Sequence, residues 1–353
     1  MEKLTVLLPG EISDRLKMML ECSIKEYDSE IIKTSDEIMN LKNKKILFAA
    51  ELNSTGINIE LFRMLEKIKL GGDNFLEGSV GSIVVNSGNE YFTRSIARMI
   101  ILYANMAGCL FMGRPLTEAT GSLKNFSSYQ KKYNMELNEA CVEECKKTVQ
   151  ELVCFNAKQF EKPKIIVLHA SNYKTSNTLA LWGMVKQNLT SKNVEIKEIH
   201  IENGSVQDCR GCVYTACKHF SQYNNCFYGG VMVEEVYPAI IESDVLIMLC
   251  PNYNDSISAN MSAVINRLTA LFRKVKFYDK YLYSIIVSGH SGSDIIAEQL
   301  ISALNINKTF MLPPKFALME TANDIGEIYK AENIEEKAKS FAENIIKTTT
   351  NKK

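Results

Sequence analysis

The sequence has little tryptophan, histidine and proline, with one, four and seven residues of each among 353. Neither charge is in excess, because 41 lysines and arginines balance 41 aspartates and glutamates. Zero net charge gives no support to a nucleic-acid partner or to an acidic membrane surface. No apolar run reaches the ~18 residues that a membrane-spanning helix needs. We therefore expect no nucleic acid and no membrane among the partners of this chain.

The motifs of hydrolytic enzymes are also missing. The sequence has no paired carboxylates, no Ser-His-Asp order and no G-x-S-x-G, so hydrolytic chemistry has little support. The N-terminal stretch MEKLTVLLPGEISDR has too short an apolar segment for a signal peptide, and we expect a first strand there. Ten cysteines without an export signal indicate a reducing compartment, so we expect a cytoplasmic protein.

Apolar strand-like runs alternate with amphipathic helical stretches along the whole chain. This order predicts parallel sheets with helices on both faces, the doubly wound α/β class. At roughly 100–200 residues per domain, the length predicts two domains. The expected boundary follows a helix at 135–155, which gives domains over residues 1–158 and 159–353.

The two halves match segment by segment. ILFAAELNSTG parallels LIMLCPNYNDS, SIVVNSG parallels SIIVSGH, and CLFMGRP parallels TFMLPPK. The last pair contains the expected fifth strands, Cys109–Met112 and Thr309–Leu312. We interpret this match as an internal duplication of one α/β domain. Only the second half has a polar loop after its first strand, whereas the first half has Glu11 there, which would repel a phosphate. The first half is therefore expected to be a degenerate copy.

A candidate anion site follows the first strand of the second half. Ile165–Leu168 is a short run typical of a strand buried on both faces, and a helical pattern begins near Thr178. The loop between them, ASNYKTSNT, is dense in hydroxyls, and a helix N-terminus adds unpaired N–H groups. The loop lacks the glycine patterns of nucleoside-triphosphate and dinucleotide sites, and suits a compact phosphomonoester such as that of FMN. The alternative is a helix that is simply N-capped by Ser or Thr.

Three motifs make the second half resemble the flavodoxin-like NADPH-dependent FMN reductase family, including its iron–sulfur flavoprotein branch. ASNYKTSNT is similar to the family's G-S-x-R-x-x-S-N-T loop, and CPNYNDSISANMSAVINRL is similar to its Pro-x-Tyr loop and the helix that follows. SGHSGSD is similar to its glycine-rich loop after strand four. The resemblance covers about residues 164–317. It departs from the family pattern at Ala170, Lys174, Ser262 and Asn266.

The resemblance implies flavodoxin-like domains with strand order 2-1-3-4-5, in which ligands bind beyond the carboxyl ends of the strands, near strands one and three. Tyr253 would lie against the flavin ring, and backbone near Gly289 and Gly292 would approach its polar edge. His290, in the third loop, is either a donor to a flavin carbonyl or a plain loop residue. The residues expected to bind FMN are Ser171, Lys174, Thr175, Ser176, Asn177, Thr178, Pro251, Asn252, Tyr253, Asn254, Ser288, Gly289, His290 and Gly292. The alternative is that Tyr253 is a surface aromatic and the glycines only make turns.

Four cysteines form a C-x2-C-x4-C-x8-C pattern in an insertion between strands two and three of the second half. They are Cys209, Cys212, Cys217 and Cys226. Four thiolates suit an iron–sulfur cluster or zinc. The resembling iron–sulfur flavoproteins hold a 4Fe-4S cluster by a more compact motif in this insertion. A structural zinc, for which His219 offers a further ligand, and free or redox-active thiols remain alternatives.

These features lead us to expect an FMN-dependent oxidoreductase with NADH or NADPH as donor, and a small molecule or protein as electron acceptor. A non-catalytic flavin-binding electron carrier and a scaffold with two empty folds are the alternatives. No acid–base residue is assigned, because the chemistry belongs to the cofactor. His169 and His200 end strands and are expected to be structural. The resemblance implies homo-oligomers with flavin sites near the subunit interface, and we expect the apolar helices of the first half to be mainly core.

Overall fold

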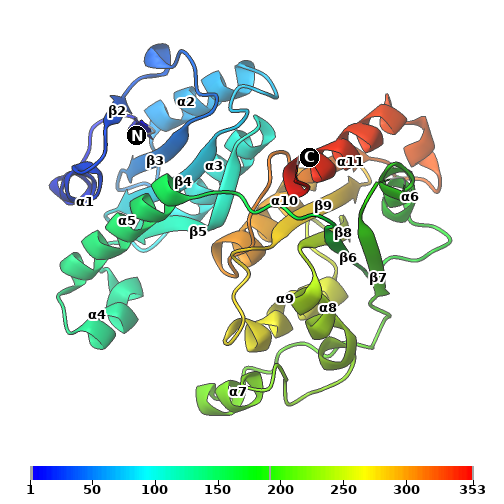
Figure 1. Ribbon diagram of the computed structural model, residues 1–353. Coiled ribbons are helices and arrows are strands. Elements are labelled where there is room, and N and C mark those ends of the chain that lie inside the picture. The colour runs from blue at the N-terminus through cyan, green and yellow to red at the C-terminus, as the bar shows by residue number, and fades with distance from the viewer. Residues whose placement is uncertain (1–2, 191, 352–353) are drawn as a thin grey trace. The chain divides into compact units, whose positions relative to one another are not determined.

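The computed structural model describes residues 3–190 and 192–351, and the chain divides into two units, residues 1–156 and 157–353 (Figure 1). The elements of the first unit are β1 (Leu4–Leu7), α1 (Asp14–Ile24), β2 (Ser29–Ile32), η1 (Ser35–Glu37), β3 (Lys45–Leu52), α2 (Ile59–Leu70), β4 (Val80–Ser87), α3 (Thr93–Met106), β5 (Leu110–Ala119), η2 (Lys124–Phe126), α4 (Ser127–Tyr133) and α5 (Leu137–Cys154).

The second unit repeats the alternation of strands and helices. Its elements are β6 (Lys164–His169), α6 (Asn177–Thr190), β7 (Glu195–His200), α7 (Tyr214–Ser221), the π-helical segment η3 (Met232–Val236), α8 (Tyr237–Glu242), β8 (Val245–Pro251), α9 (Ala259–Phe272), β9 (Tyr281–Ser288), α10 (Ser293–Leu300), the π-helical segment η4 (Ile301–Ile306), β10 (Ala317–Thr321), η5 (Glu327–Lys330) and α11 (Ile334–Thr349).

Each unit holds one five-stranded parallel sheet. The order is β2-β1-β3-β4-β5 in the first unit, and β7-β6-β8-β9-β10 in the second. Counted from the first strand of each unit, both sheets have the order 2-1-3-4-5, so the predicted doubly wound, flavodoxin-like class is confirmed. In such a sheet the first strand lies between the second and the third. The loops that follow the first and third strands border one crevice.

Helix α2 shows how the local sequence determines where a helix begins and which of its faces is buried. The Asn58 side chain caps α2 by accepting a hydrogen bond from the N–H of Leu61 at 2.9 Å. Met64, Leu65 and Ile68 follow at helical spacing and are buried with Leu61. The stripe predicted from spacing alone is therefore the core face of α2.

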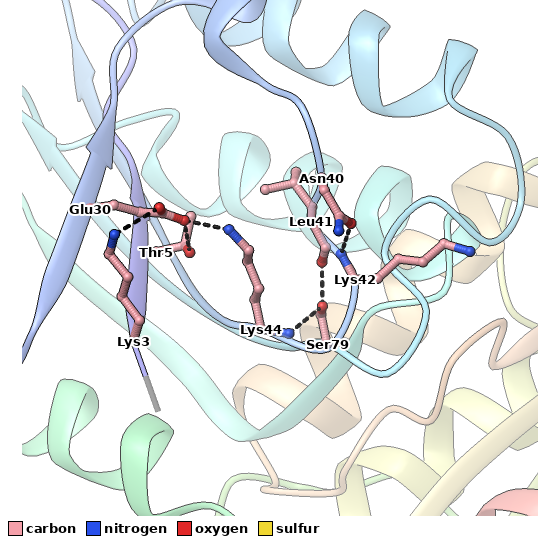
Figure 2. Close-up of polar contacts among 8 residues, drawn as sticks. All are labelled: Lys3, Thr5, Glu30, Asn40, Leu41, Lys42, Lys44 and Ser79. Atoms are coloured by element: carbon pink, nitrogen blue, oxygen red, sulfur yellow. Dashed lines mark hydrogen bonds and ion pairs between the residues drawn. The ribbon is translucent and has the colours of Figure 1, made fainter. Parts of the chain in front are cut away.

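A polar cluster ties the first strands of the first unit together (Figure 2). Glu30 of β2 accepts a hydrogen bond from the Thr5 hydroxyl at 2.7 Å and pairs with Lys3 at 3.2 Å and with Lys44. The backbone N–H of Lys44 in turn donates to the Ser79 hydroxyl at 2.9 Å. Hydrogen bonds from Lys44 and Thr5 lower the pKa of Glu30 to about 2.

The prediction that Thr309–Leu312 is the fifth strand of the second unit is wrong. In that segment one isolated bridge joins Met311 to Tyr281, and the strand itself is β10, Ala317–Thr321. Pro313 and Pro314 explain the gap, because proline has no N–H to donate to a ladder. In the first unit β5 is continuous and longer than predicted.

In each unit, the pairing between the fourth strand and the segment of the fifth strand shifts its register at the same point. Before it, Val80 pairs with Leu110 and Tyr281 pairs with Met311, so the sequence separation of the partners is the same in both units. After it, Ile83 pairs with Leu116 and Ser284 pairs with Ala317. The sequence separation of the paired residues is again equal in the two units. In both units it is longer than before the register shift.

A basic residue with positive φ lies just before the resumed pairing in each unit. Arg114 has a φ of 55° and Lys315 a φ of 52°. A left-handed conformation is uncommon outside glycine, so its recurrence at the same point of the register supports the interpretation as an internal duplication.

Candidate functional site

A cleft of about 480 Å³ opens at the carboxyl ends of β6, β7 and β8. Its walls come from the loops that follow these three strands and from the start of α9. They are formed by Ala170, Ser171, Asn172, His200, Glu202, Asn203, Tyr253, Ser258, Ala259 and Asn260. This is the crevice at which a sheet of this order binds ligands. Of the residues predicted to bind FMN, Ser171 and Tyr253 lie in these walls.

Two serine hydroxyls in the cleft walls have unsatisfied hydrogen-bonding capacity. Ser171 is 1% exposed, and neither its Oγ nor the buried Oγ of Ser258 has a hydrogen-bond partner among the described residues. A buried hydroxyl without a partner costs free energy, so its retention at a cleft indicates a group that completes the site. The two hydroxyls therefore fit the polar or anionic part of a bound molecule.

Ser258 also places a helix N-terminus at the cleft. It is the N-cap residue of the fourteen-residue helix α9, and its side chain makes no capping hydrogen bond. Sequence analysis missed this residue, although a serine directly before an apolar helical pattern is a recognisable N-cap signal. Asn260, in the first turn of α9, donates a hydrogen bond to the Asn203 side chain across the cleft wall at 2.6 Å.

The loop between β6 and α6 separates the predicted phosphate ligands into two groups. The Ser176 hydroxyl accepts a hydrogen bond from the N–H of Leu179 at 3.2 Å, so it acts as a helix cap. Lys174, Thr175, Ser176 and Asn177 line a neighbouring hollow of about 470 Å³, with Trp182, Glu198 and Tyr329 among its other walls. Thr178 is buried. The structure thus places only the start of this loop in the cleft.

Asn177 is hydrogen-bonded to a segment near the end of the chain. Its amide nitrogen donates to the carbonyls of Ala322 at 3.2 Å and Asp324 at 2.8 Å, and its amide oxygen accepts from the N–H of Gly326 at 3.0 Å. These contacts fasten the first turn of α6 to the loop after β10. The sequence contained no signal for them, because the partners belong to a distant segment near the end of the chain.

A tight turn presents Tyr253 at the cleft. Asn254 and Asp255 both have positive φ, 52° and 54°, and the N–H of Ser256 donates to the Tyr253 carbonyl at 3.1 Å. Two consecutive left-handed residues are typical of a type I′ turn. Asn254 therefore shapes the turn, and the Tyr253 ring stays 59% exposed beside the cleft.

Asn252 connects the loops after β8 and β9. Its amide nitrogen lies 3.2 Å from the Ser288 hydroxyl, 3.0 Å from the Ser291 carbonyl and 3.2 Å from the Asp255 carboxylate. Gly292, with a φ of 85°, lies against the same side chains, and a Cβ there would come within 2.3 Å of the Asp255 carboxylate. Glycine is therefore required where the two loops meet.

The rest of the predicted set lies around this junction. Pro251 is the last residue of β8. A Cβ on Gly289 would come within 2.9 Å of the Asn323 side chain, so this loop also approaches the loop after β10. His290 is exposed. The loops after β8 and β9 thus meet, while Ser288, Gly289, His290 and Gly292 lie outside the walls of the 480 Å³ cleft.

Three aromatic side chains gather where β6 and β7 end. His169 and His200 are paired in register, and their rings stack at 4.8 Å with an interplanar angle of 13°. The Tyr173 ring meets both edge-on, at 5.4 Å and 4.9 Å. His169 is fully buried. Burial, and secondly the neighbouring His200, lower the pKa of His169 to about 4.

Three of the four clustered cysteines line one apolar hollow of about 240 Å³. The hollow is formed by Cys212, Ala216, Cys217, Phe220, Cys226, Phe227, Tyr228 and Ala270. Cys209 is exposed and lies outside its walls. Arg273, the C-cap residue of α9, donates from Nε to the Cys217 sulfur at 3.1 Å.

As placed, these thiols are not a ligand set. Within residues 3–190 and 192–351, no three or more His, Cys, Asp or Glu side chains are grouped closely enough to hold a metal ion. His219, the further zinc ligand considered above, is exposed on α7.

Hydrogen bonds among side chains of the first unit bridge the loops at its equivalent crevice. Arg15 donates to the Asn86 amide oxygen at 2.6 Å and to the Ser87 carbonyl at 2.6 Å. Asn86 donates to Glu51 at 2.7 Å, and the Ser13 hydroxyl donates to the same carboxylate at 2.8 Å. The sequence pointed to Glu11 as the obstacle to a phosphate, whereas the structure shows a hydrogen-bonded network across the loops.

Fold and site together define a flavodoxin-like protein of two doubly wound units, with an open ligand cleft in the second. The sequence model of the NADPH-dependent FMN reductase family matches residues 163–324, which contain this cleft and the cysteine insertion. Among curated proteins, none shows significant sequence similarity to the chain. In the described residues no helix is long and apolar enough to span a membrane.

Several solved structures are similar in fold. RosB with bound 8-demethyl-8-formylriboflavin-5'-phosphate has a TM-score of 0.42 at 12% identity, over 54% of this chain and 82% of RosB. The NAD(P)H:quinone oxidoreductase from Methanothermobacter marburgensis has a TM-score of 0.40 at 14% identity, over 52% of this chain and 97% of that one. A quinone reductase from Klebsiella pneumoniae has a TM-score of 0.36 at 15% identity, over 52% and 84%.

Proposed function

We propose that the protein is an FMN-dependent oxidoreductase that takes electrons from NADH or NADPH. The observation that carries the proposal is the unpartnered, buried hydroxyl of Ser171 in a cleft at the switch point of the second sheet. The match of residues 163–324 to FMN reductases supports the same cofactor.

The residues present fit FMN as a ligand. The hydroxyls of Ser171 and Ser258 and the N-terminus of α9 would bind its polar and anionic parts. Tyr253, exposed at the same cleft, would pack against its ring. When bound, FMN supplies hydride and single-electron chemistry, while the chain orients the ring and limits the access of water.

Binding separates this proposal from that of an empty scaffold. Calorimetric titration with FMN should show saturation at one site per chain. Ser171→Ala should weaken FMN binding by about tenfold, because one hydrogen bond to a charged group is lost. The same change should leave the stability of ligand-free protein equal or higher, since it removes a buried hydroxyl without a partner.

Ser284→Ala is the matched control. Ser284 is equally buried, but its hydroxyl donates to the Met248 carbonyl at 2.8 Å within the sheet. This variant should lose stability and keep its affinity for FMN. Absence of heat with FMN in the wild-type protein would refute the proposal.

Reduction separates an enzyme from an electron carrier. NADH or NADPH, added without oxygen to FMN-loaded protein, should bleach the visible flavin band within the time of mixing. If neither donor bleaches it, the carrier is the better interpretation. The electron acceptor is a small molecule or a protein. It would be identified by adding each candidate to the reduced protein and measuring whether the visible flavin band returns.

We propose further that the clustered cysteines bind an iron–sulfur cluster, with zinc as the alternative. The support is the common hollow of Cys212, Cys217 and Cys226, although Cys209 would have to move to join them. Because the thiols as placed form no ligand set, we derive no electron-transfer step from them. Anaerobically purified protein should contain iron and acid-labile sulfide in equal amounts, both lost in Cys212→Ser. Stoichiometric zinc in their place would refute the cluster.

The free thiols also support a reducing setting. All ten cysteines are unpaired in the described residues, including the four exposed or half-buried cysteines of the insertion. We therefore propose a cytoplasmic location, which fractionation of cells that produce the full chain would test.

A further inference from the structure

The outward face of α2 in the first unit is unusually apolar for an exposed helix. Ile59, Phe62 and Leu70 are 65%, 44% and 79% exposed, on the side opposite the buried stripe of α2. With Tyr103 of α3 they line a hollow of about 470 Å³. A contiguous exposed apolar patch with a charged rim marks an interaction surface. This surface, which we call the α2 face, is unrelated to the proposed flavin site.

Two opposite charges, Arg63 and Glu66, lie near the middle of the α2 face, and both line the hollow. In an antiparallel copy of α2 the order of this pair is reversed, so each acid lies opposite a base. The pair is therefore complementary to an antiparallel copy of itself, and its charges sum to zero, which disfavours a strongly acidic or basic partner.

We propose that the α2 face binds the α2 face of a second copy of this chain about a two-fold axis. With the axis midway between Arg63 and Glu66, each Arg63 meets Glu66 of the other copy. Ile59 and Leu70 then cover each other at both ends, and Phe62 enters the hollow beside Tyr103. An interface of this kind uses the same patch on both copies, as two-fold symmetry requires.

The size of the surface limits the strength of the dimer. A twelve-residue helix is ~18 Å long, and a pair of them buries less than the ~1,600 Å² of a standard interface. The dimer should therefore dissociate on dilution. Sedimentation of the full chain, between about 1 and about 100 μM, should show a shift from dimer to monomer.

Charge reversal tests the predicted pairing. Arg63→Glu alone puts two acids together twice in the dimer, and Glu66→Arg alone puts two bases together twice. Each should raise the dissociation constant of its homodimer at least about tenfold. An equimolar mixture of the two variants should form a heterodimer at wild-type affinity, because both contacts again join an acid to a base.

Two controls accompany the mixture. Arg63 pairs with Glu60 of the same helix at 2.6 Å, an exposed pair of small value, so urea unfolding should confirm that both variants fold. Ile325→Glu changes an isoleucine of the second unit that is 72% exposed, and should leave the dimer intact. A monomer at every concentration, a dimer that survives Arg63→Glu, or a mixture that stays monomeric would each overturn the proposal.

Discussion

Glu30 shows how a single side chain sets the acid stability of the first unit. Its folded pKa of about 2 lies below the 4.5 of an unperturbed glutamate, chiefly through the hydrogen bond from Lys44. The stabilisation is therefore complete above about pH 4.5 and is lost as the pH falls toward about 2. Glu30→Gln should lower stability at neutral pH by about 1 kcal/mol, because the carboxylate is partly screened by solvent. Urea unfolding between about pH 2.5 and about pH 7 should show a flatter profile for the variant.

His169 acts in a different pH range. Its folded pKa of about 4 lies below the unperturbed 6.5, so the unfolded chain binds the proton more readily. The contribution to stability is complete above about pH 6.5 and is lost as the pH falls toward about 4. His169→Leu should remove about 2 kcal/mol of this pH dependence in ligand-free protein, measured as the difference in unfolding free energy between about pH 7 and about pH 4.5. His290→Gln, at an exposed loop position, should keep the wild-type difference.

At the scale of elements, the first turn of α6 depends on a single amide. Asn177 makes three hydrogen bonds to the loop after β10, and the variant Asn177→Ala would leave two carbonyls and one N–H without them. We expect a loss of about 1–3 kcal/mol in the free energy of unfolding by urea. Asn188→Ala is the matched control, since Asn188 donates only within α6, to the Met184 carbonyl at 2.9 Å. Equal losses in the two variants would contradict the tethering role.

For the whole molecule, the two units should differ in their response to FMN. Hydrogen bonds join Arg15, Asn86 and Glu51 across the crevice of the first unit, whereas the second has an open cleft. FMN should therefore bind once per chain. Amide hydrogen exchange should slow at residues 170–178 and 252–260 on adding FMN, and stay unchanged at the equivalent loops 9–15 and 52–58. Protection in both units would show that the first crevice can open.

Much of the fold could be predicted from the sequence because it depends on local patterns. The alternation of apolar strands with amphipathic helices determined two doubly wound units, and the match between the halves indicated a duplicated domain. The position of the site followed from topology, since the loops after β6 and β8 must meet at the switch point of such a sheet. Ser171 and Tyr253, two of the residues that the family resemblance implied for FMN binding, lie in the cleft walls.

Tertiary structure decided the features that depend on partners far along the chain. Spacing could not show that Asn177 binds the loop after β10, that Arg15 bridges the loops at the first crevice, or that Ser258 brings α9 to the cleft. Each role arises only when side chains from distant segments meet. The sequence by itself determined the two sheets and the crevice, at the carboxyl ends of the strands, where a ligand can bind. The packed structure decided which of the two crevices keeps a cleft. Side-chain hydrogen bonds bridge the crevice of the first unit, whereas hydroxyls are left without partners in that of the second.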